Sequence, residues 1–383
     1  MGRRKKRISG AIDFVASAIA FRGNYGYVSN EQFDRPARSN IVARMIDAGT
    51  DRVTTRLPDG YRARPFEDRD REPMIAERNT WFGPMEQADA EEWRTWERMA
   101  PDESMYRITV EDDAGRVVGL ANISAGGITP HPDGAQSAGV SVARGDRGKG
   151  IGSALLETIE EKARRREAPR LLAGASAAHP DALAWAAKRG FREIGRRIQS
   201  YVELGTFDPS PFAARLDEVR RSGITLRTIA EALEGRDQSG RDEFARALYE
   251  AESPMWEDIP YATPTPHWSY ERFHQLMFES GQLLEDASIV AYDGERIVGL
   301  TTTAKRQAQD GSTWLTGTVR EYRSRGLATA IKVEALTRAK AKDLRALLTT
   351  NDEPNKAIRG INAKLGYQTL PAHVQLEKIL SRS

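Results

Sequence analysis

Residues 140–156 read VSVARGDRGKGIGSALL, and residues 316–332 read TGTVREYRSRGLATAIK. Placed in register, the two stretches bring Gly150 onto Gly326, an offset of 176 residues. Each stretch has a β-branched run typical of a strand, a glycine-rich turn and a helix-compatible run. A repeat with this offset has the size of a whole domain. The sequence therefore predicts two copies of one domain.

A second match further along supports the repeat. At the same offset, KRGF at 188–191 falls on KLGY at 364–367. We predict an N-terminal extension at 1–58 that is disordered or loosely docked, a first domain at 59–205 and a second domain at 222–383. The link lies near 206–223, where Asp-Pro-Ser-Pro interrupts regular structure. Strands and helices alternate in both halves, which predicts α/β domains with mixed sheets.

Composition excludes several classes of function. The 383 residues carry a net charge of +2, which argues against a broad nucleic-acid-binding face. The absence of cysteine excludes disulfides and a thiol nucleophile, and it fits a cytoplasmic protein. The five histidines are scattered, so we expect no metal site. No apolar run reaches membrane-spanning length, and Asp13 inside the N-terminal apolar run argues against an export signal.

The glycine-rich turns are suited to bind phosphate. Helix starts leave backbone N–H groups without intrahelical partners, and glycine lets an anion approach the backbone closely. The turns do not match the nucleotide-binding pattern GxxxxGK[ST]. They also do not match GxGxxG, because in the first turn the third Gly would stand at position 153, which is Ser. They do match [Q/R]-x-x-G-x-[G/A] twice, at 147–152 and 323–328.

In this strand–turn–helix context, with [KR]-x-G-[FY] about forty residues later, the chain resembles the GCN5-related N-acetyltransferase (GNAT) family over 60–204 and 224–379. The resemblance implies two tandem GNAT-type acyl-CoA N-acyltransferase domains forming a pseudo-dimer within one chain, as a monomer or a homodimer. It also implies acetyl-CoA as co-substrate. Because a duplicated fold can keep a vestigial loop, we expect at least one half to be catalytically silent. The implied acetyl-CoA contacts are Val140, Ser141, Val142, Arg147, Gly148, Lys149, Gly150, Ile151, Gly152 and Ser153 in the first half, and Thr316, Gly317, Thr318, Arg323, Ser324, Arg325, Gly326, Leu327, Ala328 and Thr329 in the second.

The second half resembles the mycothiol synthase-like branch through TTNDEPNKAIRGINAKLGY. In that branch an Asn-x-x-x-Asn segment follows the strand, here Asn351 and Asn355, and Asn355 is a candidate to bind CoA or a water near the sulfur. The alternative for both asparagines is capping of the following helix. Ile361-Asn362 stands where many GNATs have Phe-Tyr, and Trp185-Ala186 stands there in the first half, so the usual tyrosine acid is absent from both.

We expect the second half to be the active one, because it also carries an aromatic segment at 253–270 that is either a substrate lip or a packed loop. Glu257 and Asp258 in this segment are candidate general bases for the amine, and the alternative is that both are exposed loop carboxylates. The expected function is transfer of acetyl to a primary amine, on a small molecule such as a cysteinyl sugar or on a peptide. The alternatives are a non-catalytic acyl-CoA-binding or sensor protein, and tight turns with a purely structural role.

Overall fold

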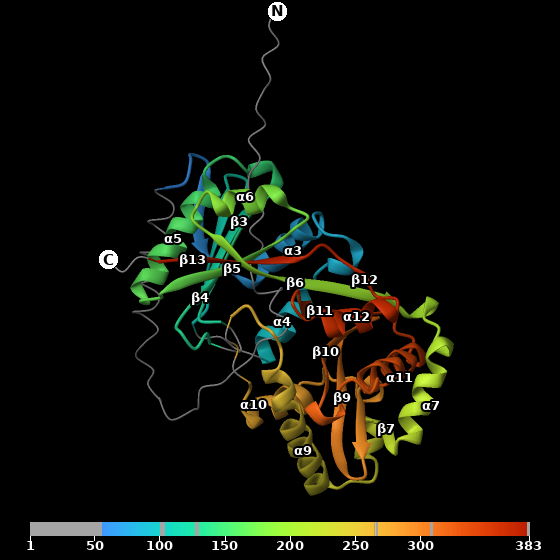
Figure 1. Ribbon diagram of the computed structural model, residues 1–383. Helices are drawn as coiled ribbons and strands as arrows, with labels where there is room; N and C mark the ends of the chain where they lie inside the picture. Colours follow the sequence, from blue (N-terminus) through green and yellow to red (C-terminus); the bar gives the residue numbers. More distant parts are fainter. Residues whose placement is uncertain are drawn as a thin grey trace, which may run out of the picture. The chain divides into compact units, whose positions relative to one another are not determined.

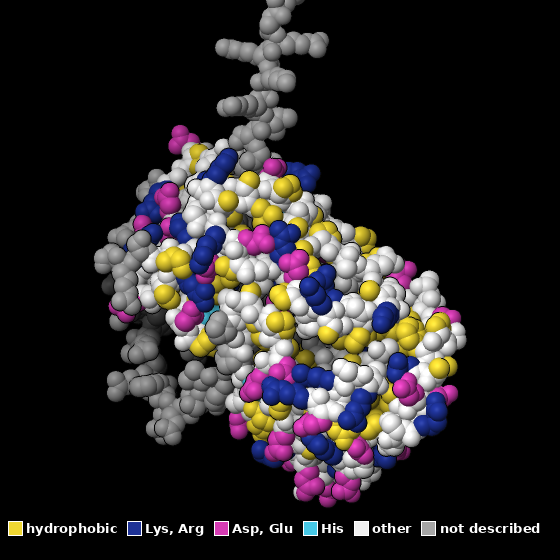
Figure 2. Space-filling model, viewed as in Figure 1, with side chains coloured by type: hydrophobic (Ala, Val, Ile, Leu, Met, Phe, Trp, Pro, Cys, Tyr) yellow, Lys and Arg dark blue, Asp and Glu magenta, His cyan; other side chains and the backbone are white. Residues whose placement is uncertain are grey.

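The computed structural model describes residues 56–99, 104–126, 130–263, 265, 267–306 and 309–380, and the predicted extension at 1–58 lies outside them except for its last three residues. The chain forms two compact units. Among the described residues, unit 1 holds those up to Gly195 and those from His373 onward, and unit 2 holds Arg196–Ala372. Figure 2 shows Lys and Arg side chains intermixed with Asp and Glu on the visible surface, in keeping with the balanced composition.

Unit 1 is a sheet in the order β1-β2-β3-β4-β5-β13 with helices against it (Figure 1). Its strands are β1 (Tyr61–Pro65), β2 (Tyr106–Asp112), β3 (Val117–Ser124), β4 (Gln136–Val142), β5 (Arg170–Ser176) and β13 (His373–Ile379). Its helices are α3 (Arg71–Asn79), α4 (Ala90–Met99), α5 (Ile151–Arg165) and α6 (Pro180–Ala187). All neighbouring strands run antiparallel except the pair β4 and β5, which is parallel.

Unit 2 repeats this sheet in the order β7-β8-β9-β10-β11-β6, with β12 also paired to β6. Its strands are β6 (Arg192–Glu203, which begins in unit 1), β7 (Ile224–Thr228), β8 (Ile289–Asp293), β9 (Arg296–Arg306), β10 (Asp310–Thr318), β11 (Ala346–Asp352) and β12 (Gln368–Thr369). Its helices are α7 (Ala213–Arg221), α8 (Ile229–Leu233), α9 (Gln238–Glu257), α10 (Tyr270–His274), α11 (Leu327–Ala341) and α12 (Lys356–Lys364). Here β10 and β11 form the parallel pair.

The sequence repeat sets the main helix of each unit. In α5 every fourth residue is fully buried, at Ile151, Leu155, Ile159 and Ala163. The same positions of α11, one repeat later, are also buried, at Leu327, Ile331, Ala335 and Ala339. A stripe at this spacing lies on one face of a helix, and it packs α5 on β3 and β4 and α11 on β9 and β10.

The compact units differ from the predicted domain boundaries by an exchange of final strands. Along β6 the chain passes from unit 1 into unit 2, and Arg197–Glu203 pairs with β11. In return β13, at the end of the chain, pairs with β5 and completes the sheet of unit 1. The predicted link at 206–223 is likewise part of unit 2, because α7 buries Val219 in the core beside α11. Each unit therefore needs residues from both halves of the sequence.

A chain ending at Ala372 tests this exchange. It loses Val374 and Leu376, which are 1% and 5% exposed in the core of unit 1. Two such side chains contribute about 3–6 kcal/mol, a large share of a domain's stability. We expect amide protection in β5 to fall more than protection in β11, measured by hydrogen exchange. A chain ending at Leu380 is the control, and equal loss in both strands would contradict the exchange.

Lys332 gives unit 2 a pH-dependent stability. Its side chain is buried in α11 with Nζ 5.0 Å from the centre of the Tyr367 ring, and burial lowers its pKa to about 7. Between pH 7 and about 10.4 the unfolded chain binds a proton that the folded chain does not, so stability rises with pH, by at most about 1.4 kcal/mol per pH unit.

We expect Lys332→Met to stabilise the protein most at pH 7 and progressively less toward pH 10, because the methionine has no charge to desolvate. Urea unfolding of both proteins across this range measures the difference. A difference that does not change with pH would show that Lys332 has an ordinary pKa in the folded state.

Candidate functional site

The glycine-rich loop of unit 1 lies between β4 and α5. Gly148 and Gly150 have φ angles of 77° and 94°, in the left-handed region that favours glycine. A side-chain carbon added to either residue would meet no heavy atom within 4 Å, so the loop is open. Lys149 does not extend over it, because its Nζ donates to Asp146 Oδ1 at 2.7 Å and to the Tyr61 hydroxyl at 2.8 Å.

The repeated arginines fasten each loop to the strand before it. Arg147 Nε donates to the Val142 carbonyl at 3.1 Å, and Arg323 Nε donates to the Thr318 carbonyl at 3.3 Å. The guanidinium of Arg147 also lies 4.6 Å from the ring centre of Trp81. The arginine of the motif thus holds the loop in place, while the start of the following helix faces any anion bound there.

In unit 2 the loop is covered by a residue that sequence reasoning missed. Gly326 has a φ of 77°, and a carbon added to it would lie 2.5 Å from Cδ and 2.8 Å from Cζ of Arg215. Arg215 comes from α7, the segment predicted to be a link, and it pairs with Glu218. A guanidinium beside a helix start adds positive charge to a place that already favours anions.

Beyond the loops, the parallel pair of strands in each unit separates. The register of β10 and β11 ends at Thr313 and Thr349, although β10 continues to Thr318 and β11 to Asp352. In unit 1 the register of β4 and β5 likewise ends at Ser137 and Leu172. Parting strands leave main-chain donors and acceptors on their facing edges.

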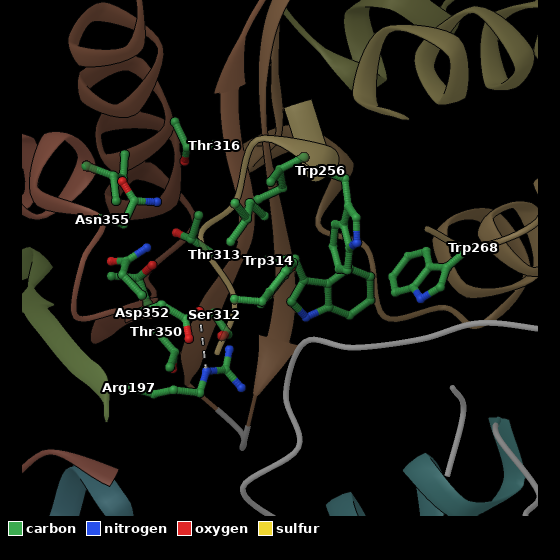
Figure 3. A pocket seen from close by; sticks show the side chains of 16 residues that line it. Arg197, Trp256, Trp268, Ser312, Thr313, Trp314, Thr316, Thr350, Asp352 and Asn355 are labelled. Atoms are coloured by element: carbon green, nitrogen blue, oxygen red, sulfur yellow. Dashed lines mark ion pairs between the residues drawn. The ribbon is translucent and has the colours of Figure 1, made fainter. Parts of the chain in front are cut away.

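A cavity that is partly open to solvent lies at this separation in unit 2 (Figure 3). One wall is polar and includes Thr316, Arg197, Asp352 and Asn355. The other wall is aromatic, and it is formed by the tryptophans Trp256, Trp268 and Trp314. Tyr261 also lines the cavity. A cavity with an apolar wall facing a few polar groups is the usual form of a small-molecule site.

A bulge in β10 directs Trp314 into this cavity. The register of β10 with β9 shifts between Thr313 and Leu315, so Trp314 has no opposite residue. A bulge bends a strand and re-aims its side chains, and bulges are frequent beside functional sites. Figure 3 shows the Trp314 indole extending along the aromatic side of the cavity.

Comparison with family models matches the Acetyltransferase (GNAT) family at residues 71–191 and again at 245–367. The chain belongs to the GNAT family. The two matched segments confirm the predicted tandem of GNAT domains, and each contains one glycine-rich loop with the strand and helix beside it.

Solved structures share the GNAT fold over most of the chain. A GCN5-related N-acetyltransferase from Sphaerobacter thermophilus has a TM-score of 0.65 at 22% identity, over 84% of this chain and 96% of that one. A tandem GNAT protein from the clavulanic acid biosynthesis pathway has a TM-score of 0.61 at 20% identity, over 84% and 99%. A search of curated proteins found no match.

The position of the usual GNAT tyrosine is occupied in unit 2 by a buried amide. Asn362 is 3% exposed, and its Nδ2 donates to Asn351 Oδ1 at 2.9 Å. Asn362 therefore fixes the side chain of Asn351 at the cavity rather than presenting an acid. Asn355 is the N-cap residue of α12, but its side chain makes no capping hydrogen bond and lines the cavity instead. This favours a binding role for Asn355 over the capping alternative.

The two candidate bases are not at the cavity. Glu257 and Asp258 are exposed at the end of α9, and neither lines the cavity. Asp258 forms ion pairs with Arg320 and Arg323, which lower the pKa of its carboxyl to about 2. A carboxyl held this firmly in its ionised form is a poor proton acceptor at neutral pH. The structure therefore favours the alternative that both are exposed carboxylates, and a role as base stays a prediction for Glu257 and Asp258.

The aromatic segment at 253–270 does contribute to the cavity. Trp256, Ile259, Tyr261 and Trp268 all line it, so this segment forms one wall as the lip hypothesis predicted. Tyr270, the last residue of the segment, is not among the lining residues. It begins α10, where the Arg246 guanidinium lies 4.0 Å from its ring centre.

Sequence reasoning missed Asp352 and Arg197. Asp352 ends β11 and is 3% exposed, and its Oδ2 lies 3.9 Å from Arg197 Nε. Burial raises the pKa of the Asp352 carboxyl, and Arg197 opposes that shift. A charged residue following the apolar run of β11 was the available signal for Asp352. Arg197 had none, because it enters unit 2 through the strand exchange.

The described part of the chain contains neither a metal-binding group nor a membrane-spanning helix. Within it, no three His, Cys, Asp or Glu side chains are grouped so that they could hold a metal ion. No helix in the same residues has the length and apolar character needed to cross a membrane.

The ion pairs of Asp258 lead to a prediction about pH. Because its carboxyl is ionised throughout the range from pH 5 to 9, Asp258→Asn should leave the shape of the acetyl-transfer pH profile unchanged. Rates measured across that range test this. Loss of an acid limb in the variant would restore Asp258 as the base.

Proposed function

We propose that this GNAT protein transfers the acetyl group of acetyl-CoA to a primary amine of a small molecule, and that unit 2 is the working half. The observation that carries the proposal is the cavity at the separation of β10 and β11, where β10 leads on to the glycine-rich loop. The absence of cysteine supports a cytoplasmic location.

Different segments of unit 2 would bind different portions of acetyl-CoA. The main chain of Thr316, Gly317 and Thr318 would pair with the pantetheine amides as an added strand. The backbone of 323–329 would hold the pyrophosphate at the start of α11, with Arg215 adding a charge-assisted contact. The thioester would then lie at the cavity, which Asn355 and Asn351 line with amide groups. In unit 1, residues 140–142 and 147–153 would have the same roles if that half binds CoA.

The chemistry needs orientation more than a special residue. An amine attacks a thioester when it is neutral and held in line with the carbonyl carbon, and backbone donors stabilise the oxyanion that forms. The missing tyrosine favours one alternative, a non-catalytic acyl-CoA-binding or sensor protein. Binding and turnover must therefore be measured separately.

Calorimetric titration of acetyl-CoA into the intact protein and its loop variants tests the proposal. Gly150→Asp and Gly326→Asp each place a carboxylate in one loop, and we expect only the second to weaken binding. Arg215→Ala should weaken binding about 10-fold or more through loss of a charged hydrogen bond. Arg220→Ala is the matched control, because Arg220 lies on the same helix and pairs with Asp217 at the surface.

The outcomes distinguish the proposed function from its alternatives. Loss of binding with Gly150→Asp alone would move the working site to unit 1. Binding without transfer to any amine would support the sensor alternative. No binding to the intact protein would overturn the acetyltransferase proposal.

A further inference from the structure

The cavity of unit 2 has a rigid aromatic wall. Trp256 and Trp268 are 5% and 4% exposed, and their ring centres are 5.4 Å apart. Tyr261 packs on Trp256 at 5.8 Å. The main chain beside Trp268 is fixed as well, because its carbonyl accepts from the Tyr249 hydroxyl at 2.7 Å. These rings are thus held in position without a ligand, which limits the entropy lost when a flat group packs on them.

Trp314 extends this wall toward the polar side. It is half-buried at the bulge of β10, next to Thr316 and the separation of the strands. Figure 3 shows the Trp314 indole between the Trp256 side of the cavity and the polar residues. A ligand on this wall therefore has its aromatic part on Trp314 and its other end near the polar wall.

The polar wall presents a buried carboxylate. Asp352 is 3% exposed, and its nearest cation is Arg197 at 3.9 Å, beyond hydrogen-bond distance. The Asp352 charge in turn contributes to the raised pKa of the Tyr261 hydroxyl, which also lines the cavity. A buried carboxylate at such a distance from its counter-ion is stabilised by a second cation at hydrogen-bond distance. An ammonium beside aromatic faces also gains a cation–π attraction.

We propose that the acceptor is an arylalkylamine, a primary amine joined by a short alkyl spacer to a planar aromatic group, and that Asp352 is the catalytic base. This inference rests on the proposed acetyl transfer in unit 2. The ring packs on Trp314 and its neighbours, and the ammonium donates to the Asp352 carboxylate.

The proposed reaction begins with loss of a proton from the ammonium. Asp352 takes one proton from the ammonium and releases it to water, which leaves the nitrogen lone pair free to attack the thioester carbonyl carbon. The new C–N bond forms, and the C–S bond breaks as the tetrahedral intermediate collapses. The second nitrogen proton goes to the departing thiolate, so the products are an amide, a thiol and one proton. Because burial raises the pKa of Asp352, this carboxylate accepts a proton more readily than an exposed aspartate does.

An acceptor panel tests the aromatic preference. We expect kcat/KM for phenethylamine and tryptamine to exceed that for n-butylamine about 10-fold or more, from ring packing. Trp314→Ala should remove most of this ratio through a higher KM for the aromatic amines alone, and Trp314→Phe should keep it. An equal or higher kcat/KM for n-butylamine or glucosamine would overturn the inference.

The pH profile tests Asp352. We expect Asp352→Asn to lower kcat for phenethylamine about 100-fold at pH 7. The deficit should shrink toward pH 10, where a large fraction of the amine is already neutral, and a merely structural role would not produce that pH dependence. Asp343→Asn is the matched control, because Asp343 is exposed in the same unit, away from the cavity, at a φ of 57° that asparagine tolerates. A deficit that is constant with pH would overturn the role of Asp352.

The same measurements distinguish failure of this inference from failure of the proposed acetyl transfer on which it rests. Transfer to glucosamine with no gain for aromatic amines overturns the inference alone. No transfer to any amine, with acetyl-CoA shown by calorimetry to bind, overturns both. Thermal unfolding of each variant with and without acetyl-CoA shows whether it is folded and still binds.

Discussion

Backbone groups on the facing edges of β10 and β11 need partners beyond Thr313 and Thr349, where the parallel ladder between these strands ends. The cavity, the bulge at Trp314 and the end of β11 at Asp352 all lie at this separation. A strand-like ligand arm can satisfy the exposed main chain, and a side-chain pocket then opens at its tip. The same separation in unit 1 shows that the duplicated sequence carries this constraint in both halves.

The exchange of final strands ties the two halves of the sequence together. Unit 1 is complete only with β13, and unit 2 only with β6. In unit 2 the exchange has a chemical consequence, because β6 carries Arg197 to the wall that holds Asp352. The electrostatics of that cavity thus depend on a residue from the first half of the repeat.

Much of the fold was predictable from local patterns. The buried stripe of α5 and the positive φ of the loop glycines follow from residue spacing and turn chemistry. At the site, the lip and Asn355 were predicted. The ion pairs of Asp258 could not be predicted, because its partners, Arg320 and Arg323, are more than sixty residues away in sequence. Arg215 was missed because Asp-Pro-Ser-Pro led us to predict that the segment around it is a linker.

The sequence by itself determined the duplication, the family and the place of each glycine-rich loop, because these depend on residues close together in the chain and on a repeat that can be aligned. The tertiary structure decided which strand completes which sheet and which charges meet. Asp352 is buried near a guanidinium, whereas Asp258 is exposed between two. The difference between the pKa values of these two aspartates could not be predicted from the sequence, since burial and long-range pairing set the pKa of a carboxyl and neither exists until the chain has folded.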